Sequence, residues 1–205
     1  MKKFFCILVI ILIVIPVFAQ KSWDGNRRMA ITINPFTIAY PPAFGGLGIQ
    51  GGFEFALVEM ASIKANVFYV RYDLGKISDN TDGSDTILSM FRLSLEGRWY
   101  PMGDYVEGFF VNGGFQFHRL SAKFDFDDAY LGIGLNTYSL YGGVGYKIVF
   151  GNSRIGFVLE PTLDFIWPVY SDIPFDKMDK SSSNILGWMM GVKLFRLGIS
   201  VGVAF

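Results

Sequence analysis

The sequence predicts an all-β protein: a transmembrane, antiparallel, up-and-down β-barrel of eight strands that follows an N-terminal signal peptide. Three observations predict this fold. The N-terminus carries a short apolar leader, segments of about ten residues alternate apolar and polar side chains with a period of two, and the polar connections between them alternate in length.

Composition narrows the class of protein. The chain has 205 residues, of which 51% are hydrophobic and 17% aromatic, while only 18% are charged. The 18 basic residues are balanced by 18 acidic ones, so no basic excess exists to bind nucleic acid. Such a low charge content also argues against a disordered or coiled-coil chain.

Residues 1–19 have the pattern of a signal peptide. Lys2 and Lys3 precede an apolar run over 4–17, and Val17-Phe18-Ala19 offers small residues at the cleavage positions. The only cysteine, Cys6, lies inside this leader, so the mature chain is predicted to hold no disulfide and no thiolate. We predict a cleaved leader over 1–19, a periplasmic segment over 20–28 and the barrel over 29–205.

Four segments show the strand alternation most clearly: 87–100, 108–118, 136–150 and 154–167. In the first, Leu93 and Leu95 share one face, while Arg92 and Ser94 share the other. One face is predicted to contact lipid and the other a polar lumen. The longest uncharged stretch of the mature chain, 29–53, holds three prolines and so cannot form a spanning helix.

Four further strands are predicted over 30–38, 47–57, 62–73 and a last segment that ends at Phe205, which makes eight. The connections over 58–61, 101–107 and 151–153 are short, whereas those over 75–86, 120–135 and 168–184 are longer and polar. Short periplasmic turns and longer outer loops are typical of outer-membrane barrels. Aromatic residues at the strand ends, Trp99, Tyr100, Trp167 and Tyr170, are predicted to form the two interfacial girdles.

The alternation slips by one residue near Phe195. Bulky apolar residues occupy even positions over 186–194 and odd positions from Leu197 onward. A β-bulge in one long strand over 185–205 explains the slip, and so does a tight hairpin near Phe195 and Arg196, which would force a ninth strand, or a tenth if another strand formed elsewhere. We favour the bulge, because both termini of such a barrel are periplasmic and its strand number is therefore even.

Four segments resemble the small bacterial outer-membrane barrels of the OmpA and OmpX type. They are Ile33-Asn34-Pro35-Phe36, the strand end Glu96-Gly97-Arg98-Trp99-Tyr100-Pro101, Leu159-Glu160-Pro161, and the closing strand from Arg196 to Phe205. The resemblance implies an integral protein of the bacterial outer membrane that contacts its lipid. It also implies that the barrel-assembly machinery binds the last strand during insertion, through Leu197, Ile199, Val201, Val203 and the terminal Phe205.

Charged residues on the inward faces form the main candidate site. Eight strands enclose an interior that side chains can fill, so these charges are predicted to pair into a network that plugs the lumen. A narrow ion path through the same residues is the alternative. The nine residues are Glu54, Lys64, Arg92, Glu96, Arg98, Lys147, Glu160, Asp164 and Arg196.

Catalytic and metal sites have little support in the sequence. His118, Ser139 and Asp164 all face inward at a similar predicted height, but the strand order puts serine between histidine and acid, whereas a triad needs histidine in the middle. The aspartates at 79, 82 and 85 and at 125, 127 and 128 could gather calcium, yet neither run has an EF-hand pattern. No catalytic, cofactor or metal residue is therefore assigned.

We expect a monomeric, non-enzymatic outer-membrane barrel without a cofactor, which serves membrane integrity or surface interaction. Two alternatives stay open. The first is a narrow channel or transporter for small or hydrophobic solutes, suggested by Pro161, which removes a ladder hydrogen bond on a lipid-facing position. The second is a lipid-modifying barrel enzyme that uses His118 as its base.

Overall fold

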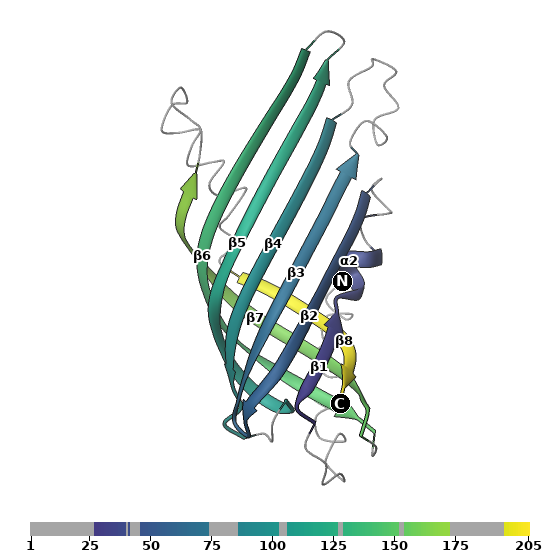
Figure 1. Ribbon diagram of the computed structural model, residues 1–205, viewed down its shortest axis with the longest axis vertical. Helices are drawn as coiled ribbons and strands as arrows, with labels where there is room; N and C mark the ends of the chain where they lie inside the picture. The colour runs from purple at the N-terminus through teal and green to yellow at the C-terminus, as the bar shows by residue number, and fades with distance from the viewer. Residues whose placement is uncertain are drawn as a thin grey trace, which may run out of the picture.

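The computed structural model describes residues 27–39, 41, 46–73, 86–102, 106–126, 129–151, 154–172 and 195–205. Over these residues the chain is a closed antiparallel barrel in which eight strands follow one another in sequence order (Figure 1). The strands are β1 Met29–Ile33, β2 Gly46–Val58, β3 Ala61–Asp73, β4 Thr86–Trp99, β5 Gly108–Phe126, β6 Ala129–Phe150, β7 Gly156–Asp172 and β8 Phe195–Ala204. The predicted eight-stranded all-β barrel is confirmed.

The predicted leader over 1–19, its cleavage site and most of the segment over 20–28 lie outside the described residues and stay predictions. The described chain begins at Arg27, whose guanidinium donates to the carbonyl oxygen of Gly151 at 2.7 Å. This bond ties the start of the barrel to the turn between β6 and β7, where Gly151 has a φ of +110° that favours glycine.

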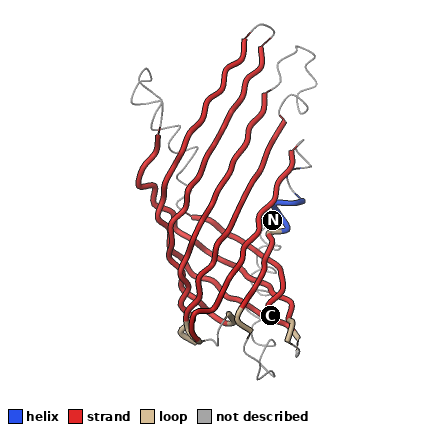
Figure 2. Tube along the Cα trace, viewed as in Figure 1, coloured by secondary structure: helices blue, strands red, loops and turns tan. Residues whose placement is uncertain are grey.

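The first predicted strand, over 30–38, is too long. β1 ends at Ile33 and a one-turn helix, α2 Pro35–Ala39, follows it (Figure 2). Asn34 caps this helix, because its side-chain oxygen accepts from the backbone N–H of Phe36 at 3.0 Å, and Pro35 occupies the first helical position. Within the described residues, no helix is long and apolar enough to cross a membrane.

Helix α2 and the residues after it pack against the inner side of β2. A Cβ at Gly48 would lie 2.5 Å from the carbonyl oxygen of Thr37, so only glycine lets the two backbones approach so closely. The side chain of Thr37 also donates to that of Gln50 at 3.3 Å.

The predicted outer loop over 120–135 is also wrong in its extent. β5 and β6 continue through this region and pair as far as Phe126 and Ala129, so the segment is a tall hairpin that rises furthest at the top of Figure 1. Its sequence lacks the strict apolar alternation of the lower strands, and for this reason the sequence pattern predicts a loop.

The last strand settles the number of strands. β8 begins at Phe195, the residue where the alternation slips, and pairs directly with both β7 and β1. A hairpin at Phe195 would instead pair residues 196–204 with the segment before them. The ten-stranded alternative is therefore wrong, while a bulge before Phe195 would lie outside the described residues.

The two faces of each strand differ sharply in exposure. On β4, Leu93 is 47% exposed and its neighbour Ser94 is 4% exposed. Rings form a continuous row across the outer face of four strands, with centroid separations of 6.4 Å for Phe91 and Phe117, 5.2 Å for Phe117 and Tyr138, and 6.1 Å for Tyr138 and Tyr170. A wide apolar belt on the outside of a closed barrel is the surface that a bilayer requires.

Three of the four predicted girdle residues, Trp99, Trp167 and Tyr170, are exposed on the outside. Tyr100 is not, because it is 0% exposed and points into the lumen. It follows Trp99 by one position, and a one-residue step along a strand moves the side chain to the other face.

Among the described residues, the strands surround the interior completely in the part nearest the short turns, which we call the turn end. Pairing of β7 with β8 stops at Phe165 and Phe195, and pairing of β1 with β2 stops at Ile33 and Gly51. Beyond these levels, toward what we call the loop end, β2 to β7 continue as a curved sheet (Figure 1). The closed part therefore defines where the interior is fully surrounded by strands.

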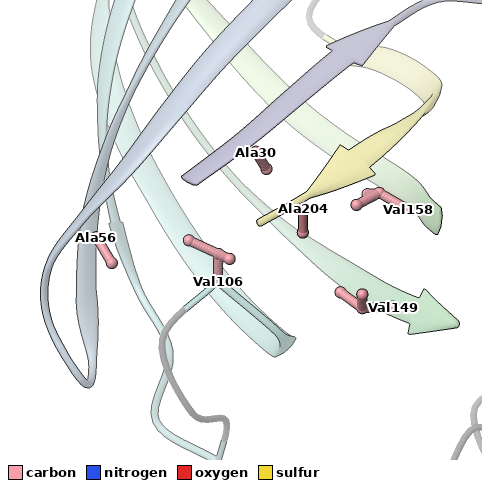
Figure 3. Packing of buried hydrophobic residues seen from close by; sticks show 6 residues of the cluster. All are labelled: Ala30, Ala56, Val106, Val149, Val158 and Ala204. Atoms are coloured by element: carbon pink, nitrogen blue, oxygen red, sulfur yellow. The ribbon is translucent and has the colours of Figure 1, made fainter. Parts of the chain in front are cut away.

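Small apolar side chains fill the interior at the turn end. They come from β1, β2, β6, β7, β8 and the turn before β5 (Figure 3), and are Ala30, Ala56, Val106, Val149, Val158 and Ala204. All six are buried. This cluster closes the lumen below the charged residues described next.

The strand phases can be tested with Leu93→Arg. An arginine on the lipid face deep in the bilayer should lower the free energy of unfolding by about 2–4 kcal/mol, because its charge must leave water. Val58→Arg is the matched control, since Val58 is also exposed but lies beside the turn, where the cost falls to about 0–1 kcal/mol. Urea titration of both variants in lipid vesicles measures the difference, and equal stability of the two would show the phase or depth to be wrong.

Candidate functional site

The nine charged residues predicted to face the lumen all lie on inward positions of their strands. Six of them form one compact network in the closed part of the barrel, which we call the charge core: Glu54, Lys64, Glu96, Arg98, Lys147 and Glu160. They come from β2, β3, β4, β6 and β7, and all six are buried. The core therefore links opposite walls of the barrel through side chains alone.

Arg98 is the centre of the charge core. Its guanidinium donates from Nη1 to Glu54 and Glu160, both at 2.9 Å, and from Nη2 to Glu160 at 2.9 Å. Its Nε donates to Glu96 at 2.7 Å. A planar guanidinium has donors for several carboxylates at once, which a lysine ammonium cannot present in this fixed geometry.

Two lysines complete the neutralisation of the carboxylates in the charge core. Lys64 reaches across the lumen from β3 and donates to Glu160 on β7 at 2.6 Å. Lys147 on β6 donates to Glu54 and lies 3.3 Å from Glu160. The charge core thus contains three cations and three carboxylates, and each carboxylate contacts at least one cation.

A second ion pair lies beyond the core, at the loop-end limit of β8. Arg196 contacts Asp164 through Nη2 at 2.6 Å and Nε at 2.9 Å, and its Nη1 donates to Gln116 at 3.2 Å. Asn112 joins this pair to the core by donating to both Asp164, at 2.9 Å, and Glu96, at 3.3 Å. We call Arg196 and Asp164 the rim pair; its arginine side chain is 23% exposed.

Arg92 is the one predicted network residue that the structure does not join to a carboxylate within the described part of the chain. Its guanidinium carbon lies 4.7 Å from the ring centroid of Phe68, on the neighbouring strand. Stacking on an aromatic ring holds the guanidinium in place but leaves its charge unpaired.

Several residues of the network were missed from the sequence. The hydroxyls of Tyr100 and Ser62 both donate to Glu54 at 2.5 Å, and that of Tyr141 donates to Glu96 at 2.7 Å. Tyr100 and Tyr141 both occupy inward positions, so the period of two could have found them. The aromatic character of Tyr100 instead suggested a place at the membrane interface, whereas the period of two does place Tyr141 on the inward face.

Phe110 supports the core from below. The guanidinium carbon of Arg98 lies 4.2 Å from the centroid of the Phe110 ring, which also contacts Tyr100 at a centroid distance of 5.4 Å. The ring fits because Gly145 faces it from β6, and a Cβ there would overlap the ring. This gives one of the mid-strand glycines of β6 a packing role.

The strand register separates the residues of the candidate triad. His118 lies opposite Thr137 on β6, whereas Asp164 lies opposite Gly143. These levels differ by six positions of β6, or roughly 20 Å at about 3.4 Å per residue. The similar height predicted for His118 and Asp164 is therefore wrong, because counting from each turn ignored the stagger between tilted strands.

No group of three possible metal ligands occurs among the described residues. The aspartates of the two acidic runs at 79, 82, 85, 127 and 128 lie outside those residues, so a calcium site there stays untested.

The residues of the predicted assembly signal all lie on the outward register of β8 or at its end. Phe205 also takes part in closing the barrel, because its carbonyl oxygen accepts from the N–H of Met29 at 2.9 Å and of Arg28 at 3.1 Å. The terminal residue therefore has a structural role besides the one implied by the resemblance.

Comparison with known proteins bears on the fold. No protein-family model and no curated protein matches the chain. The crystal structure of a major outer membrane protein from Thermus thermophilus matches with a TM-score of 0.54 at 14% identity, and covers 87% of this chain and 98% of that protein. The chain has the fold of a bacterial outer-membrane β-barrel.

CarO of Acinetobacter baumannii is also similar, with a TM-score of 0.40 and 13% identity over 90% of this chain and 99% of that protein. For the chain itself, the apolar belt and the polar, closed interior are the properties that a protein embedded in an outer membrane needs. The lipid of that membrane is the partner of its outer face.

Arg98 should be the residue on which the charge core depends most. Arg98→Met leaves three buried carboxylates with fewer donors, so we expect a loss of about 3–5 kcal/mol in unfolding free energy, as for other broken buried pairs. Arg196→Met is the matched control, because it removes the same group from one carboxylate at a partly exposed site and should cost less. Urea titration in vesicles compares the two, and an equal cost would contradict the central role of Arg98.

Proposed function

We propose that this barrel is a non-enzymatic protein of the outer membrane whose lumen is plugged, and that it serves membrane integrity or surface interaction. The observation that carries the proposal is the charge core, which joins five of the eight strands across the closed part of the barrel. Buried ion pairs that are also hydrogen-bonded are costly to separate, so nothing passes the core without breaking several of them.

The layers around the core support the same proposal. Below it, the small apolar cluster fills the turn end, and Tyr100 and Phe110 lie between the cluster and Arg98. An eight-stranded barrel has an interior just wide enough for side chains to fill. These layers therefore support the view that the lumen is filled with side chains, which stabilise the wall of the barrel.

Surface interaction is the role that the other end of the molecule supports. The β5–β6 hairpin pairs continuously as far as Phe126 and Ala129, well beyond the closed part of the barrel. This continuous ladder holds β5 and β6 together well beyond the closed part, where a recognition element could be carried.

Single-channel conductance distinguishes a plugged barrel from a barrel that acts as a channel. We expect no steady single-channel conductance from the refolded mature protein in planar bilayers, because the charge core fills the lumen. The double variant Glu96→Gln with Arg98→Gln removes one pair while keeping the core neutral, and Arg71→Gln on the outer face is the control. Steady wild-type conductance that changes in the double variant, and not in the control, would overturn the plug.

That outcome would favour a second candidate function, a transporter for small or hydrophobic solutes. One observation favours it: the pairing of β6 with β7 is interrupted between Gly145 and Ile148, opposite Pro161. Because proline has no N–H to donate, the wall is weaker here than elsewhere, as a lateral opening would need. The interruption lies beside Lys147 and Glu160, so passage there would still disturb the charge core.

We further expect the last strand to act as the signal for the barrel-assembly machinery. Phe205→Ala is a sharper test than deletion, because it removes the ring but keeps the backbone bonds to Arg28 and Met29. The variant should reach the outer membrane of cells in lower yield, yet refold in detergent like the wild type. Normal yield in cells would contradict the assembly role, and Phe195→Ala, at the other end of β8, is the control.

A further inference from the structure

The charges of the inward-facing residues that the structure describes do not balance, and the excess lies at one place. The charge core pairs three cations with three carboxylates, and the rim pair is neutral. Among the described inward-facing residues this leaves one positive charge in excess, and Arg92 is the cation without a direct ion pair: Asp164 and Glu96 attract it only from a distance. Arg196 is near enough for its like charge to oppose that of Arg92.

Arg92 lies just beyond the core on the loop-end side. Its neighbours across the ladder are Phe68 on β3 and His118 on β5, neither of which supplies a carboxylate. The guanidinium stacks over Phe68, which fixes its plane, and it makes no hydrogen bond or ion pair to another described residue. A charge in this interior that no described carboxylate contacts directly is costly, so the arrangement favours the binding of an anion at Arg92.

The interior beyond Arg92 changes character. The next inward positions on the neighbouring strands carry apolar side chains: Val70 on β3, Met90 and Leu88 on β4, Leu120 on β5 and Leu135 on β6. Val70 and Leu135 are buried. No described residue facing inward at these levels is charged, so a free, fully hydrated anion would find apolar surroundings on this side of Arg92.

We propose that the loop-end half of the interior binds a single-chain anionic amphiphile, such as a fatty carboxylate. Its head group pairs with Arg92, and its alkyl chain lies along the apolar side chains from Met90 toward Leu88. A guanidinium binds a carboxylate through two parallel hydrogen bonds, and the narrow interior of an eight-stranded barrel admits one slender ligand. This inference goes beyond the proposed function and does not depend on whether the charge core conducts.

The test uses the mature protein refolded in a non-ionic detergent and titrated with laurate, with binding counted by native mass spectrometry. We expect one laurate per barrel. Arg92→Gln should weaken this binding about tenfold or more, since a charge-assisted hydrogen bond contributes about 1.5–3 kcal/mol. Arg119→Gln is the matched control, because Arg119 is next to His118 but on the outer face, and it should bind laurate like the wild type.

Two further comparisons test the two ends of the ligand. Dodecanol, which has the chain without the charge, and acetate, which has the charge without the chain, should both bind far more weakly than laurate. Met90→Gln should weaken laurate binding and leave folding, followed by circular dichroism, unchanged.

Equal laurate binding by the wild type and a folded Arg92→Gln variant would overturn the proposal, since the amphiphile would then be held by the outer face or the detergent. Acetate binding as tight as that of laurate would overturn the assignment of an alkyl chain. Neither result would affect the conductance test, so the two proposals fail separately.

Discussion

The backbone's need for hydrogen-bond partners in hydrocarbon determines most of this structure. No water is available there, so each strand must be paired on both sides and the sheet must close. Closure rests on a short β1, whose four pairs with β8 are extended by the bonds of Phe205 to Arg28 and Met29. Once the wall is closed, alternate side chains can only point to lipid or to the interior, and every later feature follows from that division.

This constraint explains why the sequence predicts the wall so well. Lipid requires an apolar side chain at every second position, so the phases of β4 to β7 can be derived from residues such as Leu93 and Ser94 alone. The partners inside the lumen could not be derived, because they depend on the stagger between strands. Lys64 and Glu160 are 96 positions apart and meet across the barrel, and only the three-dimensional register brings them to the same level.

The failures of prediction also have physical causes. The tall β5–β6 hairpin loses the apolar alternation, because a continuous ladder of backbone pairs holds its two strands together without an apolar face. Helix α2 was missed because it lies in an apolar run that was predicted as a strand. Asn34 and Pro35 are nevertheless an ordinary N-cap and first helical residue. Because Tyr100 is a tyrosine, it was predicted to lie at the membrane interface. Its inward position instead places its hydroxyl beside Glu54.

The interior is organised by the same division between lipid and lumen. Charges cannot face the bilayer core, so they gather inside, where little water remains and each must be neutralised by another side chain. The charge core and the rim pair meet this demand, and the small apolar cluster fills the interior at the turn end. Five cations against four carboxylates leave one positive charge in excess among the described inward-facing residues, and that excess is not spread over the network. It falls on Arg92, where the charged interior ends and the apolar interior begins, so this boundary is the place where the barrel's interior is least complete by itself.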